Sequence, residues 1–191
     1  MTDTALNLAI ILGSTRDGRF GDRVAYWTAR EAERHGGYAI DLIDVMALDL
    51  PQHHPVGTTP AIDAYRARLS AADAFVVVTP EYNHSYPAGL KHAIDQAYAE
   101  WMAKPVAFVS YGGTAGGTRA TEHLRAVFAE MHAATIRDYV SFHMVRRQFD
   151  ANGHPLDRDN PRLAAKTMFD RLAWWANALR AARQAQPYGE R

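Results

Sequence analysis

The chain has 191 residues, a formal net charge of zero and no cysteine. This length suffices for one domain with a substantial core, and a neutral chain lacks the basic footprint expected of a nucleic-acid-binding protein. Without cysteine, disulfides, thiol catalysis and cysteine-ligated metals are excluded. The first residues lack a basic segment, and no apolar run approaches the roughly 20 residues of a membrane span. We therefore expect a cytoplasmic protein that binds neither membranes nor nucleic acids.

Apolar runs alternate with helical patterns along the chain. Strands are expected near residues 6–12, 38–45, 74–79, 105–110 and 134–141, and helices near 20–35, 60–72, 87–100, 117–132 and 160–184. This alternation with short connections predicts an α/β three-layer sandwich, in which helices cover both faces of a five-stranded parallel sheet of order 2-1-3-4-5. One domain is expected over residues 1–184, followed by a flexible tail over 185–191.

Three of the expected strands end in loops with ligand-binding character. These loops span residues 13–21, 80–85 and 111–117, directly after the first, third and fourth strands. In the predicted order these strands are neighbours, and ligands of open α/β sheets bind outside the carboxyl ends of the strands. We therefore expect the three loops to converge on one binding site.

The first loop has the composition of an anion site. It opens a helix, whose free N–H groups and dipole favour negative charge. The Ser14 hydroxyl can donate a hydrogen bond, and the guanidinium groups of Arg16 and Arg19 suit a phosphate dianion. The loop lacks both the Gly-Lys-Ser/Thr ending of a P-loop and the dinucleotide glycine pattern. A monophosphate site is the functional interpretation; a turn with solvated arginines is the structural one.

The second loop favours a flat, polar ring system. Tyr82 offers an aromatic face or edge, and backbone N–H groups near Glu81, Tyr82 and Asn83 can meet carbonyl and ring-nitrogen acceptors. Glu81 also has a structural interpretation, in which it caps nearby backbone or pairs across a subunit interface. His84 and Ser85 lack the G-x-S-x-G context of a hydrolase nucleophile.

The third loop is rich in glycine, with four glycines between residues 112 and 117. Glycine permits positive φ and a close approach of the backbone to a ligand. Thr118 is expected to cap the helix that follows. The loop therefore predicts a backbone surface for the other edge of the same ring.

On these residues the chain resembles the NAD(P)H-dependent FMN reductase family of the flavodoxin-like superfamily. The resemblance rests on Gly13-Ser14-Thr15-Arg16, on Pro80-Glu81-Tyr82-Asn83-His84-Ser85 and on Tyr111-Gly112-Gly113, and it extends from about residue 6 to 142. It implies a flavodoxin-like fold, bound FMN, NADPH or NADH as electron donor, and a homodimer or homotetramer with FMN near the subunit interface.

The resemblance also implies which residues hold FMN. Ser14, Arg16 and Arg19 would hold the phosphate, with Gly21 in the same part of the site. Many family members carry Ser and Asn where this chain has Arg19 and Gly21, so the phosphate contacts are open there. The residues expected along the two edges of the isoalloxazine are Pro80, Glu81, Tyr82 and Asn83, and Ser110, Tyr111, Gly112 and Gly113.

The predicted function is FMN-dependent transfer of hydride from NAD(P)H to free flavin, a quinone, or an azo, nitro or metal-oxyanion acceptor. The flavin carries this chemistry, so no catalytic side chain or metal is required. A competing hypothesis is a flavodoxin-type electron carrier, which the neutral charge and the two arginines of the first loop disfavour. Two further hypotheses are a flavin-free interaction domain, against which the three loops argue, and a hydrolase, which the missing nucleophile disfavours.

Overall fold

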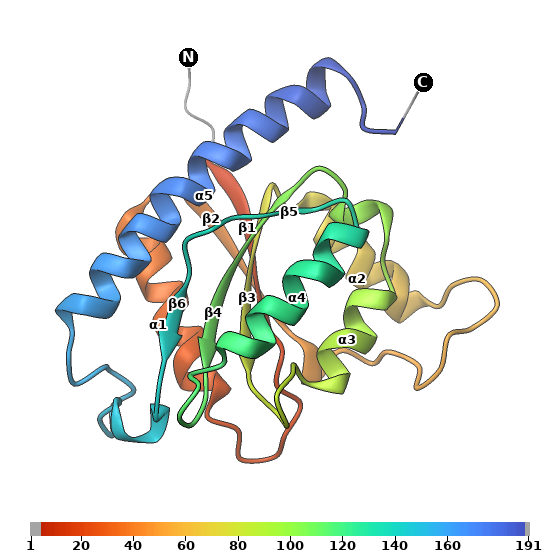
Figure 1. Ribbon diagram of the computed structural model, residues 1–191. Helices are drawn as coiled ribbons and strands as arrows, with labels where there is room; N and C mark the ends of the chain where they lie inside the picture. The colour runs from red at the N-terminus through yellow and green to blue at the C-terminus, as the bar shows by residue number, and fades with distance from the viewer. Residues whose placement is uncertain (1–4, 190–191) are drawn as a thin grey trace.

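The computed structural model describes residues 5–189, which form a parallel sheet between two layers of helices (Figure 1). The strand order is β2-β1-β3-β4-β5, with β6 also paired to β4, so the predicted order is confirmed. Helices α1 and α5 cover one face of the sheet, and α2, α3 and α4 cover the other. The elements are β1 (Leu6–Leu12), α1 (Gly21–His35), β2 (Tyr38–Asp44), η1 (Val45–Ala47), α2 (Pro60–Ala71), β3 (Ala74–Pro80), α3 (Ala88–Asp95), η2 (Ala99–Trp101), β4 (Pro105–Tyr111), α4 (Thr118–Glu130), β5 (Ala134–Thr135), β6 (Val140–Phe142), η3 (Val145–Arg147) and α5 (Asp159–Ala185).

The sheet separates two apolar cores because successive side chains of a strand point to opposite faces. Ile10 and Val76 pack in the core beneath α1 and α5. Ile11, Val77 and Phe108 pack in the core beneath α2, α3 and α4. All residues of β3 and β4 are buried, as expected for strands covered on both faces.

The fifth strand differs from the prediction over residues 134–141, because it is interrupted. β5 pairs with the amino end of β4 and β6 with its carboxyl end, both parallel. Between them, the Arg125 guanidinium donates to the carbonyls of Ile136 (2.7 Å) and Arg137 (3.2 Å). These hydrogen bonds from a side chain satisfy backbone acceptors where the strand pairing is interrupted.

One expected helix end and one expected helix cap are also wrong. The helix predicted over residues 87–100 ends at Asp95, where the N–H of Gln96 turns back to the carbonyls of Ala93 and Ile94. Thr118 does not cap α4: Gly117 holds the cap position with φ 85°, and the Thr118 hydroxyl donates to the Ala115 carbonyl at 2.9 Å. Glycine takes this position because it adopts positive φ without steric cost.

No helix within residues 5–189 combines the length and apolar character needed to cross a membrane. At the C-terminal end, α5 includes Ala185, and the Tyr188 hydroxyl lies 2.9 Å from His132 Nδ1. Residues 190–191 of the predicted tail lie outside the described residues.

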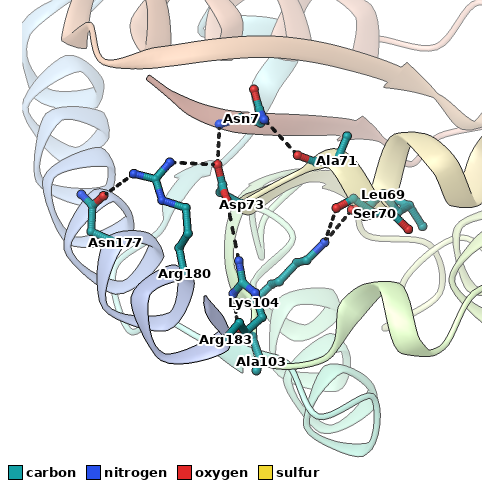
Figure 2. A network of polar contacts seen from close by, with 10 residues as sticks. All are labelled: Asn7, Leu69, Ser70, Ala71, Asp73, Ala103, Lys104, Asn177, Arg180 and Arg183. Atoms are coloured by element: carbon teal, nitrogen blue, oxygen red, sulfur yellow. Dashed lines mark hydrogen bonds and ion pairs between the residues drawn. The ribbon is translucent and has the colours of Figure 1, made fainter. Parts of the chain in front are cut away.

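A buried lysine joins elements at the amino edge of the sheet, the edge opposite the three loops (Figure 1). Figure 2 shows its contacts. Lys104, just before β4, donates from Nζ to the carbonyls of Leu69 (2.8 Å) and Ser70 (3.0 Å) in the last turn of α2. Its ammonium thereby satisfies carbonyls that a helix end leaves without intrahelical partners. Burial, together with the nearby charge of Arg183, lowers the pKa of Lys104 to about 8, against the opposing effects of Asp73 and Glu100.

Asp73, between α2 and β3, connects the same edge to β1 and α5. Its carboxylate accepts from the backbone N–H of Asn7 at 3.0 Å. It also pairs with Arg180 (3.4 Å) and Arg183 (3.7 Å) of α5, as Figure 2 shows. These contacts hold the long C-terminal helix against the sheet.

Because Lys104 titrates at about pH 8 in the folded chain and near 10.5 when unfolded, the unfolded state binds more protons between these values. We expect its contribution to make the free energy of unfolding rise by about 2 kcal/mol from pH 7 to 9.5. Lys104→Met should lack this rise. Urea unfolding of both proteins across this range measures it, and parallel pH profiles would contradict the prediction.

Candidate functional site

A cavity of about 400 Å³ opens at the carboxyl edge of the sheet, where the loops after β1, β3 and β4 meet. Nine of the twelve residues expected to bind FMN line it. They are Ser14, Arg16, Arg19, Pro80, Glu81, Tyr82, Tyr111, Gly112 and Gly113. The structure therefore brings residues from all three loops to one place.

The other three expected residues, Gly21, Asn83 and Ser110, do not line the cavity. A Cβ at Gly21 would lie 2.5 Å from the Tyr111 hydroxyl, so glycine allows α1 to start against that ring. The buried Ser110 hydroxyl donates to the Gly116 carbonyl at 2.9 Å and fixes the third loop. Asn83 has φ 47° in the turn of the second loop. All three occupy positions that shape the cavity walls.

Arg19 is engaged within the protein. Its guanidinium makes a two-pronged ion pair with Asp44 at the end of β2, with distances of 2.7 and 2.6 Å. It also donates to the Ser14 carbonyl (2.7 Å) and to Asp22 (3.0 Å), and only 9% of its side chain is exposed. These hydrogen bonds from Arg19 hold the pKa of Asp44 below its usual value, against the effect of burial. Arg19 therefore fixes the first loop to β2.

Arg16 has the opposite environment. Its side chain is exposed and makes no hydrogen bond or ion pair within residues 5–189, and its guanidinium lies 5.7 Å from the centroid of the Tyr82 ring. The Ser14 and Tyr82 hydroxyls are 2.8 Å apart, which joins the first and second loops. A free guanidinium at the rim of a cavity is available to an anionic ligand.

Glu81 has a structural partner in the same chain. Its carboxylate accepts from the backbone N–H of Arg119 (3.2 Å) at the start of α4 and from the Arg119 guanidinium (2.8 Å). This is backbone capping, one of the two structural roles that the sequence allowed for Glu81. It ties the second loop to the helix that follows the third.

Some of the expected backbone donors are already used inside the protein. The N–H of Glu81 donates to the Tyr111 carbonyl at 3.2 Å, and that of Tyr82 donates to the Ser85 carbonyl at 2.8 Å. Within the described chain, the N–H groups of Asn83 and Gly113 have no acceptor. The unused donors are thus fewer than the sequence suggested.

Five lining residues were not predicted: Phe20, Met144, Val145, Arg146 and Arg147. Four of them follow β6, where the N–H groups of Met144 and Val145 donate to the carbonyls of Gly113 (2.8 Å) and Gly112 (3.0 Å). The side chains of Arg146 and Arg147 are exposed and form no hydrogen bond or ion pair within residues 5–189. Their signal in the sequence is an arginine pair that begins four residues after the end of β6.

Comparison with known proteins identifies the family. The model of the family described as NADPH-dependent FMN reductase matches residues 6–146. The chain belongs to this family. The resemblance seen in the loops is thereby confirmed, and with it the assignment of the chain as an enzyme that uses FMN and NAD(P)H.

Relatives of this family match over different shares of the chain. A 2-hydroxy-1,4-benzoquinone reductase of a Burkholderia species is 30% identical over 186 residues, which cover 92% of this chain and 99% of the relative. An NAD(P)H-dependent FMN reductase of Pseudomonas aeruginosa is 33% identical over 183 residues, covering 89% and 95%. One from Schizosaccharomyces pombe is 34% identical over 124 residues, covering 60% of this chain and 62% of the relative.

Solved structures agree on the fold. The flavoenzyme NAD(P)H:(acceptor) oxidoreductase FerB of Paracoccus denitrificans superposes with a TM-score of 0.75 at 21% identity, covering 91% of this chain and 98% of that one. A flavodoxin of Streptococcus pneumoniae TIGR4 superposes with a TM-score of 0.57 at 15% identity, covering 88% and 98%. The flavodoxin-like fold expected from the sequence is confirmed.

The two arginines of the first loop should differ in their effect on stability. Arg19→Ala leaves Asp44 without its partner, so we expect the free energy of unfolding to fall by about 2 kcal/mol. Arg16→Ala removes an exposed side chain, and we expect a change within about 0.5 kcal/mol. Urea unfolding at pH 7 measures both values, and equal losses would contradict the distinction.

Proposed function

We propose that the cavity holds FMN and that the protein passes reducing equivalents from NAD(P)H to a small acceptor: free flavin, a quinone, or an azo, nitro or metal-oxyanion compound. The observation that carries the proposal is the convergence of the three family loops on one cavity lined by Ser14, Arg16, Tyr82 and Gly113. Bound FMN supplies hydride acceptance and donation; the chain binds, orients and shields the reactants. Among these acceptors, the quinone-reductase and FMN-reductase names of the relatives support quinones and free flavin.

The polar end of the cavity fits the phosphate of FMN. Arg16 is the cation of the first loop that has no carboxylate partner within residues 5–189, and Ser14 provides a hydroxyl beside the start of α1. Arg19 acts indirectly, because its ion pair with Asp44 holds in place the loop that contains Ser14 and Arg16. In this assignment Arg16 binds the phosphate directly and Arg19 preserves the geometry.

The ring-binding end has an aromatic side chain and backbone donors. Tyr82 and Pro80 form one wall of the cavity, and Gly112 and Gly113 contribute to another. The N–H of Gly113, which has no acceptor within residues 5–189, would be available to an acceptor of the isoalloxazine. Apolar Met144 lines the same cavity and helps exclude water there.

The arginine pair after β6 is assigned to the electron donor. Arg146 and Arg147 line the cavity, and neither pairs with a carboxylate of the described chain. A guanidinium is the usual partner of the 2′-phosphate that distinguishes NADPH from NADH. We therefore assign NADPH as the preferred donor.

The carrier hypothesis and the reductase differ in one measurement. The purified protein is titrated with FMN, followed by its visible spectrum, and then mixed anaerobically with NADPH. We expect a bound flavin that NADPH bleaches; a bound flavin that NADPH leaves oxidised would instead favour a flavodoxin-type carrier.

Arg16→Ala should raise the Kd for FMN about tenfold or more, the scale of a lost charge-assisted contact. Arg137→Ala is the matched control, since its side chain is 93% exposed and lies outside the cavity.

Donor preference tests the arginine pair. Arg146→Ala and Arg147→Ala should each raise the KM for NADPH and leave the KM for NADH nearly unchanged. The increase should be about tenfold for a variant that loses a contact with the 2′-phosphate. Initial rates with each donor and a water-soluble benzoquinone measure the two values. Equal increases for both donors would remove the pair from 2′-phosphate recognition.

The homodimer or homotetramer and the cytoplasmic location stay predictions. The exposure of Trp174 and Trp175 on α5 is compatible with a subunit contact, because large aromatic side chains are enriched at such interfaces.

A further inference from the structure

A groove lined by charged side chains lies between α1 and α5. It consists of two adjoining cavities of about 320 and 110 Å³, which share Glu31, Arg34 and Arg162. Neither shares a lining residue with the cavity assigned to FMN. The groove is therefore a separate feature of the molecule.

Positive charge exceeds negative charge in this groove. Two carboxylates line it, those of Glu31 and Asp170, against the cations of Arg30, Arg34, Arg158, Arg162 and Lys166. The whole chain has a formal net charge of zero, so the excess is local. Concentrated charge of one sign in a concave site attracts ligands of the opposite sign.

Both carboxylates are already engaged by protein cations. The Glu31 side chain is only 8% exposed, and it pairs with Arg34 and, at 3.8 Å, with Arg162. Asp170 pairs with Lys166 of the same helix at 2.7 Å and lies 2.9 Å from Nε2 of His35. These pairs hold the arginines along the groove and leave no carboxylate for the remaining cations.

Three groups of the smaller cavity retain donor capacity. Arg30 donates from Nη2 to the Gly153 carbonyl at 2.8 Å but has no carboxylate partner within residues 5–189. The Arg158 side chain makes no hydrogen bond or ion pair in that range and stands at the amino end of α5, where the helix dipole adds positive potential. Trp27 is 3% exposed, and its indole N–H likewise has no acceptor in the described chain.

We propose that this groove binds a compact molecule carrying one or two phosphate groups. Guanidinium forks match phosphate oxygens, and buried Glu31 preorganises two of them. The smaller cavity, which Arg30, Arg158 and Trp27 line, has more polar than apolar lining surface, whereas sites for large flat ligands are mostly apolar. The small, concave form favours a compact phosphate compound over an acidic protein surface.

Inorganic pyrophosphate is the probe for this site. It is titrated calorimetrically into protein saturated with FMN, at low ionic strength, so that the flavin occupies the first cavity. We expect binding, with the Kd raised about tenfold or more in the double variant Arg30→Gln/Arg158→Gln. Arg171→Gln, an exposed arginine of α5 outside the groove, is the matched control and should bind like the unaltered protein.

The location is tested by the NMR signal of the Trp27 indole N–H. Its shift should change during the pyrophosphate titration with the Kd found by calorimetry. Arg158→Gln alone should also weaken pyrophosphate binding. Because the Arg158 side chain makes no hydrogen bond or ion pair within the described residues, this variant should fold normally, and a loss of affinity would reflect the binding site. The proposal would be overturned by absence of binding at millimolar pyrophosphate or by equal affinity in the double variant. It would also be overturned if Arg146→Ala abolished binding, because the anion would then lie in the cavity assigned to FMN.

Discussion

The site depends on the pairing of β3 with β1 on one side and β4 on the other. Leu12 pairs with Val78, and Pro80 pairs with Tyr111, so the three strands end at neighbouring positions of one edge. The hydrogen bond from the Gly13 N–H to the Val78 carbonyl extends this pairing into the first loop. The loops are thus held by a buried sheet, and their convergence does not require a ligand. This explains how short loops form a defined cavity.

The arginines of the cavity divide into those that build it and those that remain available. Arg19 is buried against Asp44, and a phosphate there would compete with a carboxylate that already satisfies the guanidinium. Arg16, Arg146 and Arg147 have no such partner within residues 5–189. The presence of an arginine in the cavity is therefore not enough to assign it to a phosphate. Whether its guanidinium is already paired within the protein determines whether it is available to a ligand. The same reasoning separates the engaged from the available arginines of the α1–α5 groove.

The sequence predicted the sheet order and the first, second and third loops because buried strands and glycine-rich turns leave local patterns. It did not predict Asp44 as the partner of Arg19, since 25 residues separate them and only the pairing of β1 with β2 brings them together. The interruption of the fifth strand depends on Arg125 from α4, a tertiary contact without a local signal. The motif resemblance ended near residue 142, so Arg146 and Arg147 were not assigned to the site.

The segment after β6 has a wider role than a connection to α5. Its first part, Met144 to Arg147, lines the cavity proposed for FMN, while His154, Pro155 and Arg158 line the α1–α5 groove. Hydrogen bonds across the segment, from the Asp150 N–H to the His154 carbonyl and from the Leu156 N–H to the Gln148 carbonyl, both 2.8 Å, make it a compact unit. Both hydrogen bonds lie within residues 148–156, between Met144–Arg147 of the cavity and Arg158 of the groove. The connection from β6 to α5 therefore contributes lining residues both to the cavity and to the groove.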